Sequence, residues 1–169
     1  MGAYATTYIS TTSATATRVA DSFSRSNIYT NGLISASGGT WFVELRGNVA
    51  VTGDASGDGI LFQTTGNTDN FRFLGNTTNG RIQIWKRVSS VNSQLYTTTT
   101  DTVKIAIKWN GSTADIFANG TKVVSATAFT ATQLQEFVVN TLGTPKFIQQ
   151  MALFSTPLSD TDCTTLTTL

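Results

Sequence analysis

Strict alternation of apolar and polar residues is the feature that most constrains the fold of this chain. It is clearest between positions 102 and 110, where large apolar residues take every second place: Val103, Ile105, Ile107 and Trp109. This period of two puts the apolar side chains on one face of a β-strand, whereas a helix would spread them around its axis. Asn-Gly pairs follow at 110–111 and 119–120, and Asn-Gly supplies the positive φ angles of two-residue hairpin turns. Residues 102–125 are therefore predicted to form a three-stranded meander.

Further strand-sized segments occur before and after this meander. In the first of them, Trp41, Val43 and Leu45 alternate with more polar neighbours, so both Trp41 and Trp109 are expected in the core. The others are centred on residues 59–63, 71–73, 82–84, 137–139 and 147–154. The last of these is apolar on both faces, which predicts a central position in its sheet.

The spacing of these segments predicts an all-β fold with two packed antiparallel sheets. Turn-forming residues separate the strands and no long helical pattern alternates with them, which favours a sandwich over a fold of βαβ units. One short C-terminal helix is expected after Ser159, a good N-cap followed by Asp160 and Asp162 in the first turn. We expect a single globular domain, with residues 1–27 as a lead-in arm or strand and residues 28–169 as the sandwich.

The composition excludes several classes of partner. Charged residues make up only 12% of the chain, with 11 Lys plus Arg against 10 Asp plus Glu, so no strong field is available to attract nucleic acid. No apolar stretch approaches the roughly 20 residues needed for membrane insertion, and the N-terminus lacks the order of a signal peptide. A soluble chain is expected. The single cysteine, Cys163, has no partner within the chain for a disulfide.

The sequence offers little for catalysis. The chain has no histidine, which removes His-based triads and the commonest general base. Glycoside hydrolysis would need two carboxyl groups about 5 to 9.5 Å apart, yet no cluster of acids alternates along a strand. We therefore assign no catalytic residue and expect a protein that is not an enzyme.

A glycine-rich acidic loop provides the only candidate for a metal. Asp54, Ser56, Asp58 and Gly59 match the first half of a calcium loop, in which oxygens at alternate positions surround the ion. The second half fails, because Thr65 stands where a bidentate Glu is required. No metal site or other cofactor is assigned, and calcium at Asp54 and Asp58 stays an alternative to a solvated turn.

Trp85 is the best candidate for contact with a ligand. Strand alternation places it on the same face as Arg81, Gln83 and Arg87, while Ile82, Ile84 and Val88 point the other way. An exposed indole can stack on sugar C–H groups, and the polar neighbours can pair with hydroxyls. Phe42 lies on the polar side of its own strand and would extend this surface if the two strands were neighbours. The alternative is structural: Trp85 packs under a loop or against a second subunit.

Three stretches carry a resemblance to a known family. Residues 103–124 contain KIAIKWNGSTADIFANGTKV, residues 147–166 read FIQQMALFSTPLSDTDCTTL, and residues 2–23 read GAYATTYISTTSATATRVADSF. The first two resemble a hairpin and the closing strand and helix of the laminin G-like branch of the concanavalin A-like lectin/glucanase superfamily. The third is similar to a segment that precedes such domains in bacteriophage tail and virion proteins.

The resemblance implies a jelly-roll sandwich and a place on the surface of a phage particle. It implies a virion domain in a tail fibre, spike or head decoration that attaches to host-surface glycan or to other virion proteins. It also implies a homo-oligomer, with the trimer of fibrous phage parts as the expected form. A purely structural module that caps or stabilises an assembly is the first alternative. A degenerate glycoside hydrolase is the second, because the superfamily has hydrolytic members.

Overall fold

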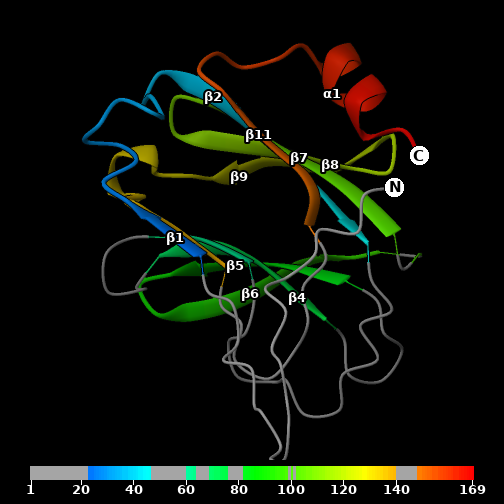
Figure 1. Ribbon diagram of the computed structural model, residues 1–169, viewed down its shortest axis with the longest axis horizontal. Helices are drawn as coiled ribbons and strands as arrows, with labels where there is room; N and C mark the ends of the chain where they lie inside the picture. Colours follow the sequence, from blue (N-terminus) through cyan, green and yellow to red (C-terminus); the bar gives the residue numbers. More distant parts are fainter. Residues whose placement is uncertain are drawn as a thin grey trace, which may run out of the picture.

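Two antiparallel β-sheets packed face to face form the body of the molecule in the computed structural model (Figure 1). The structure describes residues 23–46, 60–63, 69–75, 82–98, 100, 102–139 and 148–169. One sheet has five strands and the other six, and a short helix lies outside the five-stranded sheet. The predicted all-β sandwich with a C-terminal helix is confirmed.

The five-stranded sheet contains the predicted meander. Its strands, in spatial order, are β11 (Ile148–Phe154), β2 (Gly38–Arg46), β7 (Thr102–Asn110), β8 (Thr113–Ala118) and β9 (Thr121–Ala128). Asn119 and Gly120 join β8 to β9 with φ angles of 48° and 77°, the pair of positive angles expected of Asn-Gly. The preceding turn is shifted by one residue, because Asn110 still pairs with Thr113 and Gly111 takes the positive φ of 66°.

The six-stranded sheet includes one strand that the sequence did not predict. In spatial order its strands are β1 (Phe23–Ser26), β10 (Glu136–Val139), β3 (Ile60–Gln63), β4 (Asn70–Gly75), β5 (Ile82–Val88) and β6 (Val91–Thr97), with the 3₁₀ turn η1 (Ala131–Gln133) just before β10. The unpredicted strand is β6, which forms a hairpin with β5. Its turn consists of Ser89 and Ser90, with φ angles of 47° and 68°.

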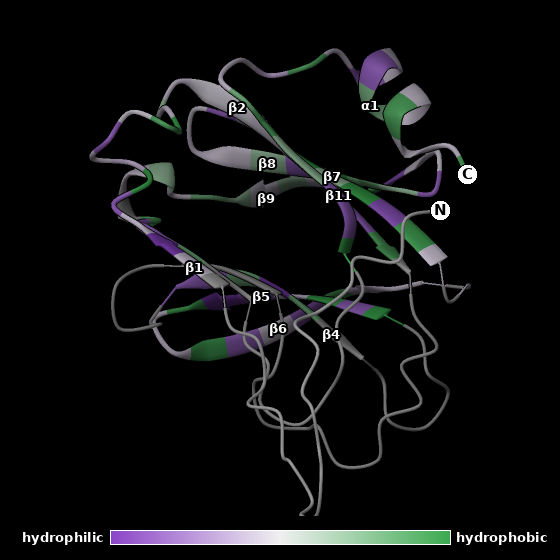
Figure 2. Ribbon diagram, viewed as in Figure 1, coloured by the Kyte–Doolittle hydropathy of each residue, from purple (hydrophilic) through white to green (hydrophobic). Residues whose placement is uncertain are grey.

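The core lies between the two sheets. Trp41 and Trp109 are 2% and 0% exposed, which confirms their prediction as core residues. Aromatic contacts bridge the layers: the Trp41 ring stacks on Phe73 of the other sheet at 5.1 Å. The Trp109 ring stacks at 5.2 Å on Phe129, which stacks in turn on Phe71 of β4 at 5.5 Å. Figure 2 shows apolar and polar residues alternating along the strands that enclose this core.

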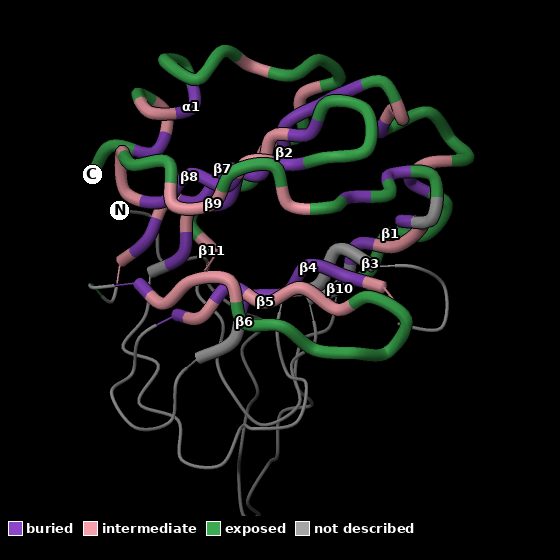
Figure 3. Tube along the Cα trace, turned by 180° about the vertical axis from the view of Figure 1, so that it is seen from behind, coloured by how far each residue is buried: buried purple, intermediate pink, exposed green. Residues whose placement is uncertain are grey.

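Helix α1 (Asp160–Thr167) covers part of the outer face of the five-stranded sheet. The Ser159 side chain caps it by accepting a 3.1 Å hydrogen bond from the Asp162 amide, as predicted. Cys163, on its inner side, is fully buried with Ala106 and Phe117. Figure 3 shows buried residues both in α1 and in the strands of the two sheets. The contact between α1 and this outer face therefore forms a second, smaller core.

Strand β11 corrects the expectation of a central position for residues 147–154. It is an edge strand, paired only with β2 among the described strands. The apolar residues on its inner face, Met151 and Leu153, remain 42% and 40% exposed. Apolar residues occur on both faces of β11. One face borders the space between the sheets, and the other belongs to the outer face of the sheet, where α1 also lies.

Candidate functional site

Trp85 lies on the outer face of the six-stranded sheet. Ile82 and Ile84 of the same strand are 4% and 0% exposed and belong to the core between the sheets. Alternation therefore directs Gln83, Trp85 and Arg87 away from the core, as the sequence predicted, and all three are half-buried. The second predicted arginine of this group, Arg81, lies outside the described residues.

Strand register brings additional polar residues to Trp85. Arg72 of β4 lies directly opposite Trp85 on one side, and Gln94 of β6 lies opposite on the other. Residues directly opposite in an antiparallel pair share a face. We define the Trp85 face by six described residues of these three strands: Arg72, Gln83, Trp85, Arg87, Asn92 and Gln94.

Sequence reasoning did not find Arg72, Asn92 or Gln94. The alternation of Phe71 and Phe73 around Arg72 gave a signal for its outward direction. The partner strand of β4 could not be read from that alternation, and β6 was not predicted at all. Only the observed register shows that these residues border the indole.

The indole is held in place by a neighbour on its own strand. Trp85 Nε1 donates a 3.0 Å hydrogen bond to Gln83 Oε1. On β6, Gln94 Nε2 donates a 2.8 Å hydrogen bond to Thr97 Oγ1, and Gln94 itself is exposed. The ring orientation is therefore fixed before any ligand arrives, and amide groups stand beside it.

The Trp85 face carries positive charge. Its six members include two arginines and no acidic residue. Arg72 is only 8% exposed, and burial, followed by repulsion from Arg87, lowers the pKa of its guanidinium. Arg72 Nε has no hydrogen-bond partner among the described residues. A planar polar ligand that offers lone pairs would suit this face.

Phe42 does not extend the Trp85 face, and that expectation is wrong. Strand β2 belongs to the five-stranded sheet and β5 to the other, so Phe42 and Trp85 lie in different layers. Phe42 is only 3% exposed. Thr40, on the same side of β2, is fully buried and its Oγ1 accepts a 3.0 Å hydrogen bond from the Leu158 amide. The segment between β11 and α1 therefore covers this polar side of the strand.

One pair of carboxylates is brought together by the fold, Asp115 and Asp160. Both are bridged by the ammonium groups of Lys108 and Lys122, which also lie over the Phe117 ring. The Lys108 and Lys122 side chains are the leading cause of the lowered pKa of Asp160. For Asp115, burial acts to raise the pKa, but hydrogen bonds from the Ala126 amide and Lys122, together with the charges of Lys122 and Lys108, lower it below its usual value. A glycosidase acid needs a raised pKa, so this pair is unsuited to that role.

The described residues contain no metal site. No group of three or more His, Cys, Asp or Glu side chains in that part of the chain could hold an ion. The acidic loop with Asp54 and Asp58 lies outside the described residues. Within the described ranges, no helix is long and apolar enough to cross a membrane.

A comparison with solved structures identifies a domain of similar fold. Domain 4 of AbnA, a GH43 extracellular arabinanase from Geobacillus stearothermophilus solved in complex with arabinotriose, matches with a TM-score of 0.58 at 16% identity, over 80% of this chain and 69% of that one. The two domains share the fold of a jelly-roll β-sandwich.

Two other solved structures match less closely. Carbohydrate-binding module CBM66 from Bacillus subtilis gives a TM-score of 0.46 at 13% identity, over 70% of this chain and 76% of that one. Domains LG4-5 of the mouse laminin alpha1 chain give 0.43 at 10% identity, over 73% of this chain and 37% of that one. No family model and no curated protein matches the sequence.

Proposed function

We propose that this chain is a non-catalytic glycan-binding domain and that the Trp85 face is its contact surface. The observation that carries the proposal is the half-buried indole on an outer sheet face, oriented by Gln83 and bordered by Arg72 and Gln94. Aromatic rings in such a position stack on the C–H groups of a sugar ring, and amide and guanidinium groups pair with its hydroxyls. The structural similarity to an arabinanase domain solved with arabinotriose supports the same function.

We further propose a phage particle as the setting. The support comes from the sequence alone, through the resemblance of residues 2–23 to segments that precede such domains in virion proteins. In that setting the domain would attach the particle to host-surface glycan as part of a homo-oligomer, and a trimer would match the symmetry of fibrous phage parts. Light scattering on the purified chain tests the oligomer: a mass of one chain in solution contradicts it.

A glycan array tests the binding function directly. The wild-type domain is expected to bind a restricted group of glycans, and Trp85→Ala is expected to lose that binding. Removal of one sugar-stacking ring weakens affinity by about 1 to 3 kcal/mol, or roughly fivefold to 150-fold. Val88→Ala is the matched control, since Val88 is exposed on the same strand but points to the other face.

The outcomes separate the rival functions. No binding across a broad array would contradict the proposal and favour the purely structural module. Binding retained in Trp85→Ala would move the contact surface elsewhere. Accumulation of reducing ends during incubation with mixed polysaccharides would establish the hydrolase alternative.

A further inference from the structure

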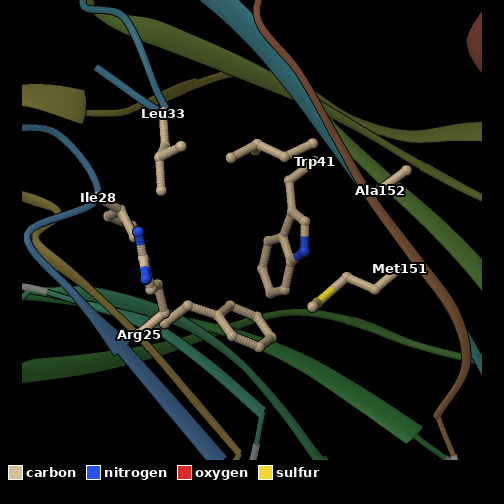
Figure 4. A pocket seen from close by; sticks show the side chains of 8 residues that line it. Arg25, Ile28, Leu33, Trp41, Met151 and Ala152 are labelled. Carbon is tan, nitrogen blue, oxygen red and sulfur yellow. The ribbon is translucent and has the colours of Figure 1, made fainter. Parts of the chain in front are cut away.

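A cavity of about 160 Å³ opens between the two sheets at the edge bordered by β1 and β11 (Figure 4). It lies on the inner side of the six-stranded sheet, whereas the Trp85 face lies on the outer side. Its apolar walls come from both layers and from the turn after β1: Ile28, Leu33, Trp41, Phe137, Met151 and Leu153. A ligand there would contact neither Trp85 nor its neighbours.

The cavity has a rigid floor and an open mouth. Trp41 and Phe137 at the floor are 2% and 7% exposed, and their rings meet edge to face at 5.4 Å. Leu33 and Met151 are each about 40% exposed and border the solvent side. The space is therefore preformed and reachable, as a small-molecule site requires.

Arg25 adds a single positive charge to these apolar walls. It lies opposite Phe137 in the β1–β10 pair, and Phe137 faces the core, so Arg25 also projects toward the opposite sheet. Figure 4 shows its guanidinium beside Ile28, across the cavity from the Trp41 indole. No ion pair or hydrogen bond joins Arg25 to another of the described residues.

We propose that this cavity binds a small monocarboxylate with one apolar ring, of the size of benzoate. A cavity of roughly 150 Å³ lined by apolar side chains holds benzene, so one ring matches the available volume. The ring would lie against the Trp41 indole on the side that faces Arg25 (Figure 4), and the carboxylate would accept hydrogen bonds from the Arg25 guanidinium, whose planar fork fits a carboxylate. The charge selects an anion over a neutral ring of the same size.

Titration of the ¹⁵N-labelled chain with benzoate, followed by NMR, tests the proposal. Amide shifts are expected at Arg25, Leu33, Trp41 and Met151, with a Kd on the order of 1 mM for so small a ligand. Benzyl alcohol keeps the ring and replaces the carboxylate, and the wild-type chain should bind it roughly tenfold more weakly. Absence of shifts at these residues, or equal affinity for the two ligands, would overturn the proposal.

Two charge-matched variants complete the test. Arg25→Gln is expected to weaken benzoate binding about tenfold and to leave benzyl alcohol binding within about twofold of wild type. Arg87→Gln removes the same charge from the Trp85 face and should leave benzoate binding unchanged. Trp85→Ala should also bind benzoate normally, so failure of the glycan proposal and failure of this one are distinguishable. An unchanged benzoate affinity in Arg25→Gln would contradict the role of the charge.

Discussion

Trp109 packs its indole against Gly39, the residue directly opposite it in the β2–β7 pair. A Cβ atom at position 39 would fall within 2.6 Å of Cη2 and 2.8 Å of Cε2 of that ring. The indole is fully buried and its Nε1 donates a 2.8 Å hydrogen bond to the Ser35 carbonyl. The Trp109 ring therefore cannot shift to make room for a Cβ atom at position 39.

Gly39→Ala is expected to destabilise the fold. Overpacking of a filled core costs about 1 to 3 kcal/mol, and for a chain of this size each kcal/mol lowers Tm by roughly 2 to 4 °C. Urea unfolding followed by Trp fluorescence measures the change. The same substitution in a Trp109→Phe background should cost less, because the smaller ring leaves space. Equal costs in the two backgrounds would show that Trp109 is not the obstacle.

The β5–β6 turn can be improved. Ser89 and Ser90 both adopt positive φ angles, which serine disfavours and which Asn-Gly adopts readily. Replacement of Ser89-Ser90 by Asn-Gly is expected to raise the free energy of unfolding by about 0.5 to 1 kcal/mol. Replacement by Ala-Ala should lower it. A stabilisation by Ala-Ala would contradict the turn geometry.

Acid should weaken the attachment of α1 through the Asp115 and Asp160 carboxylates. Both have a folded-state pKa below the unfolded value, so their contribution is present above about pH 4 and is lost as pH falls through the folded pKa. Asp160 is more than half exposed, so its ion pairs contribute no more than about 1 kcal/mol. Asp160→Asn should lower the free energy of unfolding at pH 7 and make little difference at pH 2. A difference that persists at pH 2 would contradict the electrostatic cause.

Cys163 should resist thiol reagents in the folded chain. Burial, the largest cause, raises the pKa of its thiol to about 11, so the reactive thiolate is scarce at pH 8. Modification by a disulfide reagent should be slow in buffer and fast in urea. Since the raised pKa makes the thiol stabilising below the unfolded value, its contribution is lost between about pH 9 and 11. Cys163→Ala should remove this alkaline loss, and rapid labelling of the folded chain would show that α1 opens readily.

Strong alternation on one face gave the clearest strand predictions. Strands β2 and β7 have apolar inner faces, and the Asn-Gly turn at 119–120 has the backbone angles that its residues favour. Strand β6 was missed because residues 91–94 are exposed and largely polar, so no burial pattern marks them. Its turn was missed because two serines are not a characteristic signal for positive φ.

The errors at the site arise from long-range topology. Alternation correctly directed Phe42 away from the Trp41 side of β2, but it could not show that the chain returns after β11 to bury that side. The same pattern in β11 indicated a central strand, although β11 lies at the edge of its sheet and pairs only with β2 among the described strands. The members of the Trp85 face come from three strands, and only their register brings Arg72 and Gln94 beside the indole.

The position of α1 also determines how this molecule can be presented on a support. Leu169 is 61% exposed and leaves from the layer that α1 covers, on the far side of the sandwich from strands β4, β5 and β6 (Figure 1). A tag fused after Leu169 would attach the domain to the support on the side that α1 covers. The Trp85 face would then be turned toward the solution that contains the analyte. We therefore recommend C-terminal capture for a surface assay.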